Sequence, residues 1–397
     1  MLSRNDFDFD TRIDRRGSSS FKWDSDERDT GRRNLLPFWV ADMDFAAPPP
    51  VLQALERRLD HGVFGYTARP ESLDEAMIGW FARRHDWAIE AAAAFEVPGV
   101  VPFIHMYVRE LVPAGEAVVI QEPVYYPFRR AMERNGRKVA VNPLVRDTSG
   151  RWRMDLDGLD GLLEAGGAST LILCSPHNPV GRVWSRPELL ELADLCRRRG
   201  VTVLSDEIHA DLIHPGHRHI PWLSLPADRL PRSVALVSPT KTFNIPGLSV
   251  AYGITPDTAL RRRLTDMIES MGMGIGSSAP LAFAAAEAAW RHGDAWLESL
   301  LDYLGENDRL LRRTLADRGA PLSAAPMEGT YLEWLRVDGS GEDDEALWDR
   351  LLDRGIRLSR GRQFGRGGEA HLRMNIACPR SQLVEGLERM IPALEVR

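Results

Sequence analysis

The sequence predicts an α/β fold, with a large domain built on a mostly parallel β-sheet and a smaller α/β domain at the C-terminal end. Two observations support this prediction. Short apolar runs recur through the middle of the chain, and each is followed by a polar loop rich in proline, which is typical of buried strands that lead into loops. Two of these runs are joined by a segment with clear helix start and stop signals, and such a strand–helix–strand unit makes a parallel pair.

The strand–helix–strand unit has the clearest secondary-structure signals in the sequence. Residues 170–174 (TLILC) form the first apolar run. Ser185 and Glu188 then have the spacing of a capping box, which predicts the start of a helix. Gly200 is placed to end that helix. Residues 201–204 (VTVL) follow at once and predict the second buried strand.

Further apolar runs predict strands of the same sheet at residues 118–121, 138–141 and 234–237. After about residue 286 the pattern becomes mainly helical. Helices are predicted at about 287–319 and 343–355, with short strands near 331–335 and 371–376. The expected division is an N-terminal segment that packs with the small domain (1–45), a large domain (46–286) and a small C-terminal domain (287–397).

The composition is that of a globular protein and excludes several classes. Of the 397 residues, 44% are hydrophobic and 27% are charged, and the formal net charge is −7, so no basic surface for nucleic acid is predicted. The first twenty residues contain no apolar stretch, and no segment is long enough to span a membrane. Cys174, Cys196 and Cys378 are widely scattered, which argues against a disulfide framework and a zinc site. We therefore expect a cytoplasmic protein with no nucleic-acid or membrane partner.

Polar residues follow the predicted strands of the large domain. Asn178, Asp206 and Lys241 each lie just beyond the end of one strand. Because α/β proteins bind ligands at the carboxyl ends of parallel strands, we expect these side chains to line one crevice. Pyridoxal phosphate requires a lysine that forms a Schiff base and an acid that keeps the pyridine nitrogen protonated. Singly, Lys241 could be a surface lysine, Asp206 a helix cap and Asn178 a turn former, but together they favour a site for pyridoxal 5'-phosphate.

Longer motifs resemble those of one enzyme family. SPHNPVG at 175–181, SDEIHADL at 205–212 and SPTKTFNIPGL at 238–248 resemble the fold-type I aminotransferase superfamily of pyridoxal-phosphate enzymes. More narrowly, the chain resembles the MalY/PatB-type carbon–sulfur β-lyases, which are cystathionine β-lyases, in FWVADMDF (38–45), HGVFGYT (61–67), PGVVP (98–102), IQEPVYYPF (120–128) and RMNIACP (373–379). The resemblance implies the fold of that superfamily and a homodimer with active sites at the subunit interface.

The resemblance also implies roles for residues around the cofactor ring. Lys241 is expected to be the Schiff-base lysine and the base that removes the Cα proton of the substrate. Asp206 is expected to pair with the pyridine nitrogen. Asn178 and His209 are expected to lie near the phenolic oxygen of the cofactor.

A tyrosine and a helix N-terminus complete the expected cofactor site. Tyr125 is expected to stack on the ring, with Tyr126 as its rival for this role, and Tyr125 could instead be a core aromatic. The motif PGVVP opens a predicted helix, and a helix N-terminus attracts phosphate. The phosphate ligands implied by the resemblance are the N–H groups of Val100 and Val101 together with Ser238 and Thr240.

Other residues are expected to contact the substrate. Arg373 would bind the α-carboxylate through two hydrogen bonds, although an arginine of this kind commonly forms a surface ion pair. Trp39 would line the substrate site, and Tyr66 would reach the site of the neighbouring subunit and its phosphate. Arg360 and Arg362 stand where relatives more often have a Pro-Gly pair. Either arginine could contact an extra acidic group on the substrate, or both could be solvated.

The expected reaction is a β-elimination. Residues 242–249 (TFNIPGLS) contain no basic residue, whereas many aminotransferase relatives place one there to hold the phosphate. In this respect the chain resembles the lyase subgroup. The predicted enzyme is a cysteine-S-conjugate β-lyase that converts cystathionine, cysteine or an S-substituted cysteine to pyruvate, ammonia and a thiol. The alternatives are an aminotransferase and a regulatory binding module that retains lyase activity.

Overall fold

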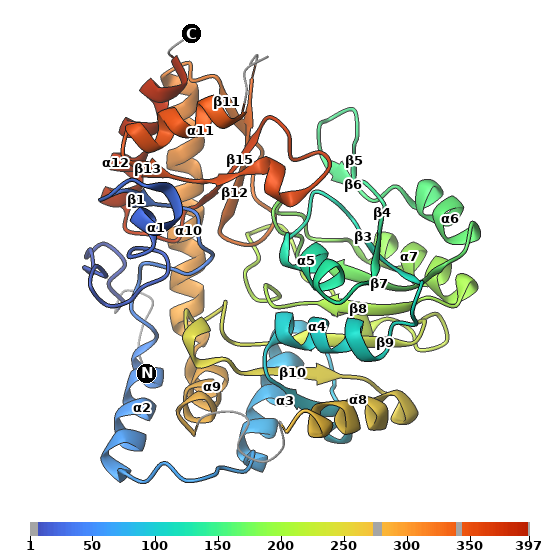
Figure 1. Cartoon of the computed structure of the whole chain (residues 1–397). Coiled ribbons are helices and arrows are strands. Elements are labelled where there is room, and N and C mark those ends of the chain that lie inside the picture. The colour runs from blue at the N-terminus through green and yellow to red at the C-terminus, as the bar shows by residue number, and fades with distance from the viewer. Residues whose placement is uncertain (1–6, 273–279, 339–343, 396–397) are drawn as a thin grey trace.

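The computed structural model describes residues 7–272, 280–338 and 344–395, and the centre of this part is a seven-stranded β-sheet (Figure 1). The strands lie in the order β2-β10-β9-β8-β7-β3-β4. Neighbours from β9 to β4 are parallel, and β10 runs antiparallel to both of its neighbours. The expected, mostly parallel sheet is therefore confirmed. Its strands are β2 (Ala94–Val97), β3 (Ala117–Ile120), β4 (Lys138–Val141), β7 (Ala168–Cys174), β8 (Thr202–Asp206), β9 (Ser233–Val237) and β10 (Ala251–Ile254).

The predicted strand–helix–strand unit is present. Strands β7 and β8 pair in parallel, and α7 (Arg186–Arg199) joins them. The Ser185 side chain accepts a hydrogen bond from the N–H of Glu188, and the Glu188 carboxylate accepts one from the N–H of Ser185, so the capping box forms. The helix ends at Gly200, whose φ of 68° is accessible to glycine without strain.

Strand β2, at one edge of the sheet, and its neighbour β10 are absent from the sequence prediction. Both are short, and Gly253 interrupts the apolar run of β10. A Cβ atom at Gly253 would lie 2.3 Å from the ring of Phe95 on the paired strand β2. The glycine thus leaves room for an aromatic ring on the neighbouring strand. Because glycine is not typical of a strand interior, it also makes the strand harder to predict from the sequence.

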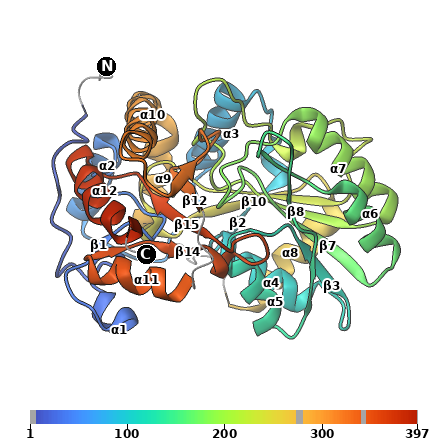
Figure 2. The same ribbon diagram turned by 90° about the horizontal axis from the view of Figure 1, so that it is seen from above.

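Helices cover both faces of the large sheet (Figures 1 and 2). α4 (Val100–Glu110), α5 (Pro127–Arg134) and α8 (Thr258–Ser270) pack on one face, and α6 (Leu156–Glu164) and α7 pack on the other. Ile172 faces the first group, whereas its neighbours Leu171 and Leu173 face the second. Burial on both faces explains why the strands read as continuous apolar runs. No helix in the described ranges is long and apolar enough to cross a membrane.

A second, smaller sheet lies toward the C-terminus, with its strands in the order β11-β12-β15-β14 and all neighbours antiparallel. The predicted strands near 331–335 and 371–376 are β12 and β15, and the helix predicted at 343–355 is α11. The elements of this unit are β11 (Leu322–Ala324), β12 (Leu332–Val337), β14 (Ser359–Arg360), β15 (His371–Asn375), α10 (Asp294–Asp317), α11 (Asp344–Asp353) and α12 (Arg380–Glu395).

The single helix predicted at 287–319 is wrong, because the structure has two helices there. α9 (Pro280–His292) ends before Gly293, and α10 begins at Asp294. A Cβ atom at Gly293 would lie 2.2 Å from the ring of Phe243, so only glycine fits beside this buried ring. α9 packs on α2 (Pro49–His61) and α3 (Glu71–His85).

The N-terminal segment lies against the small sheet unit (Figure 1). β1 (Leu36–Pro37) pairs in parallel with β13 (Ile356–Arg357), more than three hundred residues further along the chain. We propose that this segment and the small sheet belong to one domain. The boundary expected at residue 286 falls inside α9, and we propose that it lies at Gly293 instead.

A buried charge cluster fixes the N-terminal segment in place. The Asp44 carboxylate, only 2% exposed, accepts hydrogen bonds from Lys22 (2.8 Å), Trp23 (2.8 Å) and Arg15 (2.7 Å). Gln382 of α12 donates a fourth bond at 2.9 Å. Burial alone would raise the pKa of Asp44, but its contacts with Lys22, Trp23 and Arg15 lower it further than burial raises it. The carboxylate therefore links the segment to the small sheet unit.

We expect Asp44→Ala to lower the free energy of unfolding by about 3–5 kcal/mol, because it leaves the Lys22 ammonium buried without its carboxylate. Urea unfolding measures this loss. The matched control is Asp353→Ala, which removes an exposed pair with Arg32 and should cost less than about 1 kcal/mol. A depressed folded-state pKa stabilises the fold above the unfolded pKa, so the difference between wild type and Asp44→Ala should shrink below about pH 4. Equal unfolding midpoints for the two variants would contradict this account.

Candidate active site

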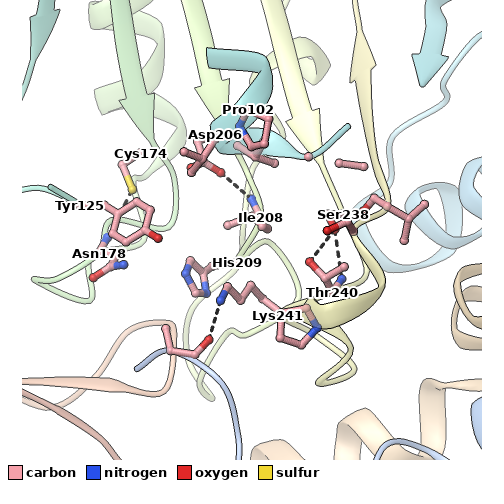
Figure 3. Close-up of a pocket in the computed structure, with 18 residues that line it drawn as sticks. Pro102, Tyr125, Cys174, Asn178, Asp206, Ile208, His209, Ser238, Thr240 and Lys241 are labelled. Atoms are coloured by element: carbon pink, nitrogen blue, oxygen red, sulfur yellow. Dashed lines mark hydrogen bonds between the residues drawn. The ribbon is translucent and has the colours of Figure 1, made fainter. Parts of the chain in front are cut away.

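Side chains from the ends of β7, β8 and β9 meet in one cavity of about 200 Å³ (Figure 3). Asn178, Asp206 and Lys241 all line it, as their positions after successive strands predict. In Figure 3, Asp206 and Lys241 lie on opposite sides of the cavity, between Tyr125 on one flank and Ser238 on the other. The space between them is bounded by an acid, an amine, an aromatic ring and a hydroxyl group.

Lys241 carries the reactive nitrogen of this cavity. The chain has three lysines, of which Lys22 is buried in the Asp44 cluster and Lys138 is on the surface. Burial lowers the pKa of Lys241 to about 8, and the charge of Arg373 lowers it too, while Asp42 and Asp206 oppose this shift. About a tenth of the amine is therefore unprotonated at pH 7, and the unprotonated form is the one that attacks a carbonyl group.

Asp206 is buried, and within the described residues no cation is in direct contact with it. Its Oδ1 accepts a hydrogen bond from the N–H of Ile208 at 3.1 Å, so the local turn expected of a capping aspartate does form. Burial, and then the charge of Glu207, raise the pKa of Asp206 to about 7, against the lowering effects of Ile208 and Lys241. A carboxyl group in this state gains much from a cationic ring nitrogen placed beside it.

Arg373 is buried rather than paired at the surface. Its Nη1 donates to Oδ1 of Asn178 at 3.1 Å, and its Nη2 donates to the carbonyl of Trp39 at 2.6 Å. The guanidinium lies 4.9 Å from the ring centre of Phe364, and its Nε has no partner. No carboxylate in the described ranges forms an ion pair with it. A buried cation of this kind suits a substrate carboxylate.

Tyr125 and His209 flank the cavity. Tyr125 lines it, whereas Tyr126 does not and packs against Tyr125 at 5.6 Å between ring centres. Burial lowers the pKa of His209 to about 3, so its ring is neutral. Its Nδ1 is buried and has no partner within the described chain. This nitrogen is available for a polar atom of a bound molecule.

The opposite flank of the cavity is built to receive an anion. Val100 and Val101 open α4 after Gly99, whose φ of 140° brings the chain sharply into the helix. The first N–H groups of a helix have no partner within it. The Ser238 hydroxyl lies 2.7 Å from that of Thr240 and both line the cavity. The bulky residues of α4 lie in the core instead, namely Phe103, Ile104, Met106, Tyr107 and Val108.

Some expected site residues, including Arg373, are not among those that line the cavity. Tyr66 is 95% exposed, which leaves it free to reach another subunit. The Trp39 ring packs under Arg357 at 3.7 Å, and only its backbone carbonyl meets Arg373. Trp39 is not among the residues that line the cavity, and its role in the substrate site stays a prediction. Neither Arg360, which packs on the Trp348 ring, nor Arg362 lines the cavity.

Residues 39–45, here called the strap, border the cavity through Ala41, and the backbone contacts of this segment were not predicted from the sequence. The Ala41 carbonyl accepts from Nζ of Lys241 at 2.5 Å and from the Tyr331 hydroxyl at 2.9 Å. The side-chain amide of Asn375 donates to the carbonyls on either side, at residues 40 and 42 (2.7 and 2.6 Å). These acceptors are backbone atoms, so residue types gave no signal for them.

Buried polar side chains next to Asp206 and Lys241 in the sequence belong to one network, here called the buried polar ladder. Asp211 accepts from Thr242 at 2.8 Å and lies 2.6 Å from Nε2 of His85. Glu207 lies 2.8 Å from Nε2 of His219, and the two histidine rings meet edge to face at 5.5 Å between centres. Thr242 follows Lys241 in the chain and Glu207 follows Asp206. The ladder therefore joins the residues next to the two groups that face each other across the cavity.

The residues present fit pyridoxal phosphate. Asp206 suits the ring nitrogen, the unpartnered Nδ1 of His209 suits an oxygen on the ring, and Lys241 suits the aldehyde carbon. The start of α4 with Ser238 suits the phosphate. Within the described ranges, no group of His, Cys, Asp and Glu side chains could hold a metal ion.

Comparisons with known proteins agree with this geometry. The model of the family "aminotransferase class I and II" matches residues 33–390. The chain is 40% identical over 387 residues to cystathionine β-lyase PatB of Bacillus subtilis, covering 97% of this chain and 99% of PatB. A pyridoxal-phosphate-bound protein of Clostridium difficile, named a candidate aminotransferase, matches with a TM-score of 0.95 at 37% identity, covering 98% of this chain and 100% of its own. Cystalysin of Treponema denticola, whose structure contains pyridoxal 5'-phosphate, matches with a TM-score of 0.93 at 32% identity, covering 98% and 99%.

We expect Lys241 in the cofactor-free protein to titrate with a midpoint near pH 8. Brief acetic anhydride labelling across a pH series, read by mass spectrometry, measures this, with the exposed Lys138 as the internal reference. Asp206→Asn removes a negative charge that raises the pKa, so the midpoint should fall, and Arg373→Gln should move it upward. Midpoints that stay fixed in both variants would show that these charges do not reach Lys241.

Proposed function

Because the chain belongs to the aminotransferase class I and II family, we propose that it is a pyridoxal-phosphate-dependent carbon–sulfur β-lyase. Its substrates are cystathionine, cysteine or S-substituted cysteines, and its products are pyruvate, ammonia and a thiol. The observation that carries this proposal is the placement of Lys241 and Asp206 across one cavity whose lining contains no other lysine and no arginine. The relatives named as cystathionine β-lyases support it.

Bound pyridoxal phosphate supplies an electron sink for the negative charge that develops at the substrate Cα. Asp206 maintains that sink, because its carboxylate favours a protonated ring nitrogen. Asn178 and His209 would hold the phenolic side of the ring, and Tyr125 lines one flank of the cavity. Each of these residues acts by position and charge.

Arg373 and Lys241 act on the substrate. Arg373 binds the α-carboxylate, with Asn178 and the Trp39 carbonyl fixing its guanidinium. Lys241 takes the Cα proton as a neutral amine, and the Ala41 carbonyl then accepts a hydrogen bond from the ammonium that results. With the proton removed, the thiolate leaves Cβ, and hydrolysis yields pyruvate and ammonia.

The choice between lyase and aminotransferase rests on the phosphate end. Ser249 stands in the segment where many aminotransferase relatives carry a basic residue, and it lines the cavity at φ 34°. The phosphate ligands proposed here are therefore neutral, namely the N–H groups of Val100 and Val101 with Ser238 and Thr240. An aminotransferase is the second candidate, because a relative of similar overall shape carries that name.

We also propose that the enzyme is a cytoplasmic homodimer in which Tyr66 completes the partner's active site. Large apolar side chains are exposed around the end of α2 and the loop after it, including Leu59, Val63 and Phe64. Tyr66 lies in the same loop. Such an apolar surface is costly to leave in water and suits burial in a subunit interface.

The reaction type is tested with cystathionine and a panel of cysteine conjugates. We expect stoichiometric pyruvate and thiol, no turnover by Lys241→Ala, and a kcat lowered roughly 10²–10³-fold in Asp206→Asn, because the carboxylate stabilises charge along the reaction path. Accumulation of pyridoxamine phosphate with release of a keto acid would make the enzyme an aminotransferase. Near-normal turnover by Asp206→Asn would reduce that residue to a turn former.

The shared active site is tested by subunit complementation. Tyr66→Phe and Lys241→Ala homodimers should each be inactive, while a mixture allowed to exchange subunits should regain activity, because one site in each mixed dimer carries neither change. Mass spectrometry of the intact dimers confirms exchange. If exchange is complete and activity does not return, Tyr66 belongs to the site of its own subunit or to none.

A further inference from the structure

A second cavity, of about 350 Å³, opens between the two sheet units and shares no lining residue with the active-site cavity. One wall is the hairpin of β5 (Val145–Arg146) and β6 (Trp152–Arg153), with the loop at residues 180–182 beside it. The other wall is the small sheet, through β12, β15 and the loop before β12. None of the steps proposed for the lyase uses these residues.

The small sheet connects this cavity to the active site. On adjacent strands β12 and β15, Trp334 is paired with Arg373 and Arg336 is paired with His371. Residues paired in this way, two apart along each strand, project from the same face of a sheet. The face that presents Arg373 to Asn178 therefore continues as Trp334, His371 and Arg336, which line the second cavity.

Aromatic rings form a flat part of the lining. The rings of Trp334 and His371 are stacked, with 4.8 Å between centres and an angle of 8° between planes. The ring of Trp152 lies 6.0 Å from that of His371, on the opposite wall. The Trp334 Nε1–H is buried and has no partner within the described chain. Buried donors are rarely left unsatisfied, so an acceptor on a bound molecule suits this position.

The lining also has surplus positive charge. Its arginines are Arg146, Arg151, Arg182 and Arg336, and its acids are Glu328 and Glu333. Glu328 forms ion pairs with Arg151 (2.6 Å) and Arg182 (3.0 Å). Burial and the nearby Asp308 raise the pKa of Glu333 well above its usual value, so it contributes no charge.

Arg146 and Arg336 remain as cations for a ligand. Arg146 donates to the Gly150 carbonyl at 2.9 Å and lies 5.5 Å from the ring centre of Trp152. Arg336 forms an ion pair with the exposed Asp338, with 3.5 Å between Nε and Oδ1. Neither arrangement uses the whole guanidinium, which carries five N–H donors.

We propose that this second cavity binds a small aromatic carboxylate. The ring of the ligand lies against Trp152 and His371, and its carboxylate meets Arg146 and Arg336. The stacked rings favour a planar molecule over an aliphatic one, and the guanidinium groups favour a carboxylate over a neutral group.

Occupancy of this cavity acts on the substrate site through Trp334, and this second step rests on the proposed lyase function. Besides stacking on His371, the Trp334 ring meets the Phe364 ring edge to face at 5.4 Å. Phe364 in turn lies under the guanidinium of Arg373. A ligand that bridges the two walls therefore favours one position of Arg373, and it changes the affinity for the substrate carboxylate.

Titration calorimetry of the holoenzyme with benzoate tests the site, with benzamide and cyclohexanecarboxylate as the matched neutral and non-planar probes. We expect saturable binding of benzoate and binding at least roughly tenfold weaker for either control probe. Arg336→Gln and Arg146→Gln should each weaken benzoate roughly tenfold, while Arg153→Gln, an exposed arginine of the same hairpin outside the lining, should not.

The Arg373→Gln variant separates the two cavities. Benzoate binding that survives Arg373→Gln and weakens in Arg336→Gln supports the second site. Binding lost only in Arg373→Gln, equal binding of benzamide, or no saturable binding would each overturn it. In the lyase assay, benzoate should change KM for cystathionine in the wild type and not in Arg336→Gln. Binding without a change in KM would overturn the coupling and leave the site, whereas a failure of the lyase assay itself would count only against the proposed function.

Discussion

Two buried cations, Lys241 and Arg373, impose the constraint on which the rest of the site depends. Neither has a carboxylate in direct contact within the described ranges, so neutral acceptors must solvate them. The strap does this with its main chain, through the carbonyls of Ala41 and Trp39. The cavity is therefore complete only when the N-terminal segment is docked. The Asp44 cluster ties that segment to α12 and so helps to hold the two carbonyls in place, although its own residues do not line the cavity.

The positions of Asp206 and Lys241 are also fixed by buried polar contacts. Asp206 and Lys241 must keep their separation across a flat ring, and the residues that follow them, Glu207 and Thr242, both enter the buried polar ladder. Burial by itself would raise the pKa of Asp211, but hydrogen bonds from His85 and others lower it. The Nδ1 of His219 is buried without a partner in the described chain, but the paired groups resist displacement, because moving them would leave further buried polar groups unpaired. The ladder thus limits how far the two facing groups can move apart.

The features that could be predicted from the sequence are those that depend on the side chains of the segment itself. Strands β7, β8 and β9 were legible because burial on both faces makes them continuously apolar, and the residues after them were legible because parallel strands share an edge. The break at Gly293 and the strand interrupted by Gly253 were missed, because each depends on a distant aromatic ring, Phe243 or Phe95. The contacts of the strap were not predicted for another reason. They are made by its backbone carbonyls, which every residue type possesses.

The charge of the phosphate end also follows from the fold. With Ser249 in the segment where relatives place a basic residue, the lining offers the partial positive charge at the start of α4 and neutral hydroxyl groups. Backbone N–H groups hold an anion by direction and dipole, without a side-chain cation. Under the proposed function, the two cations Lys241 and Arg373 act on the substrate, and the phosphate would be held by groups that do not titrate. Under the proposed function, Lys241 and Asp206 are then the site residues whose pKa lies near neutral pH, because Arg373 stays charged and the phosphate ligands have no proton to exchange there.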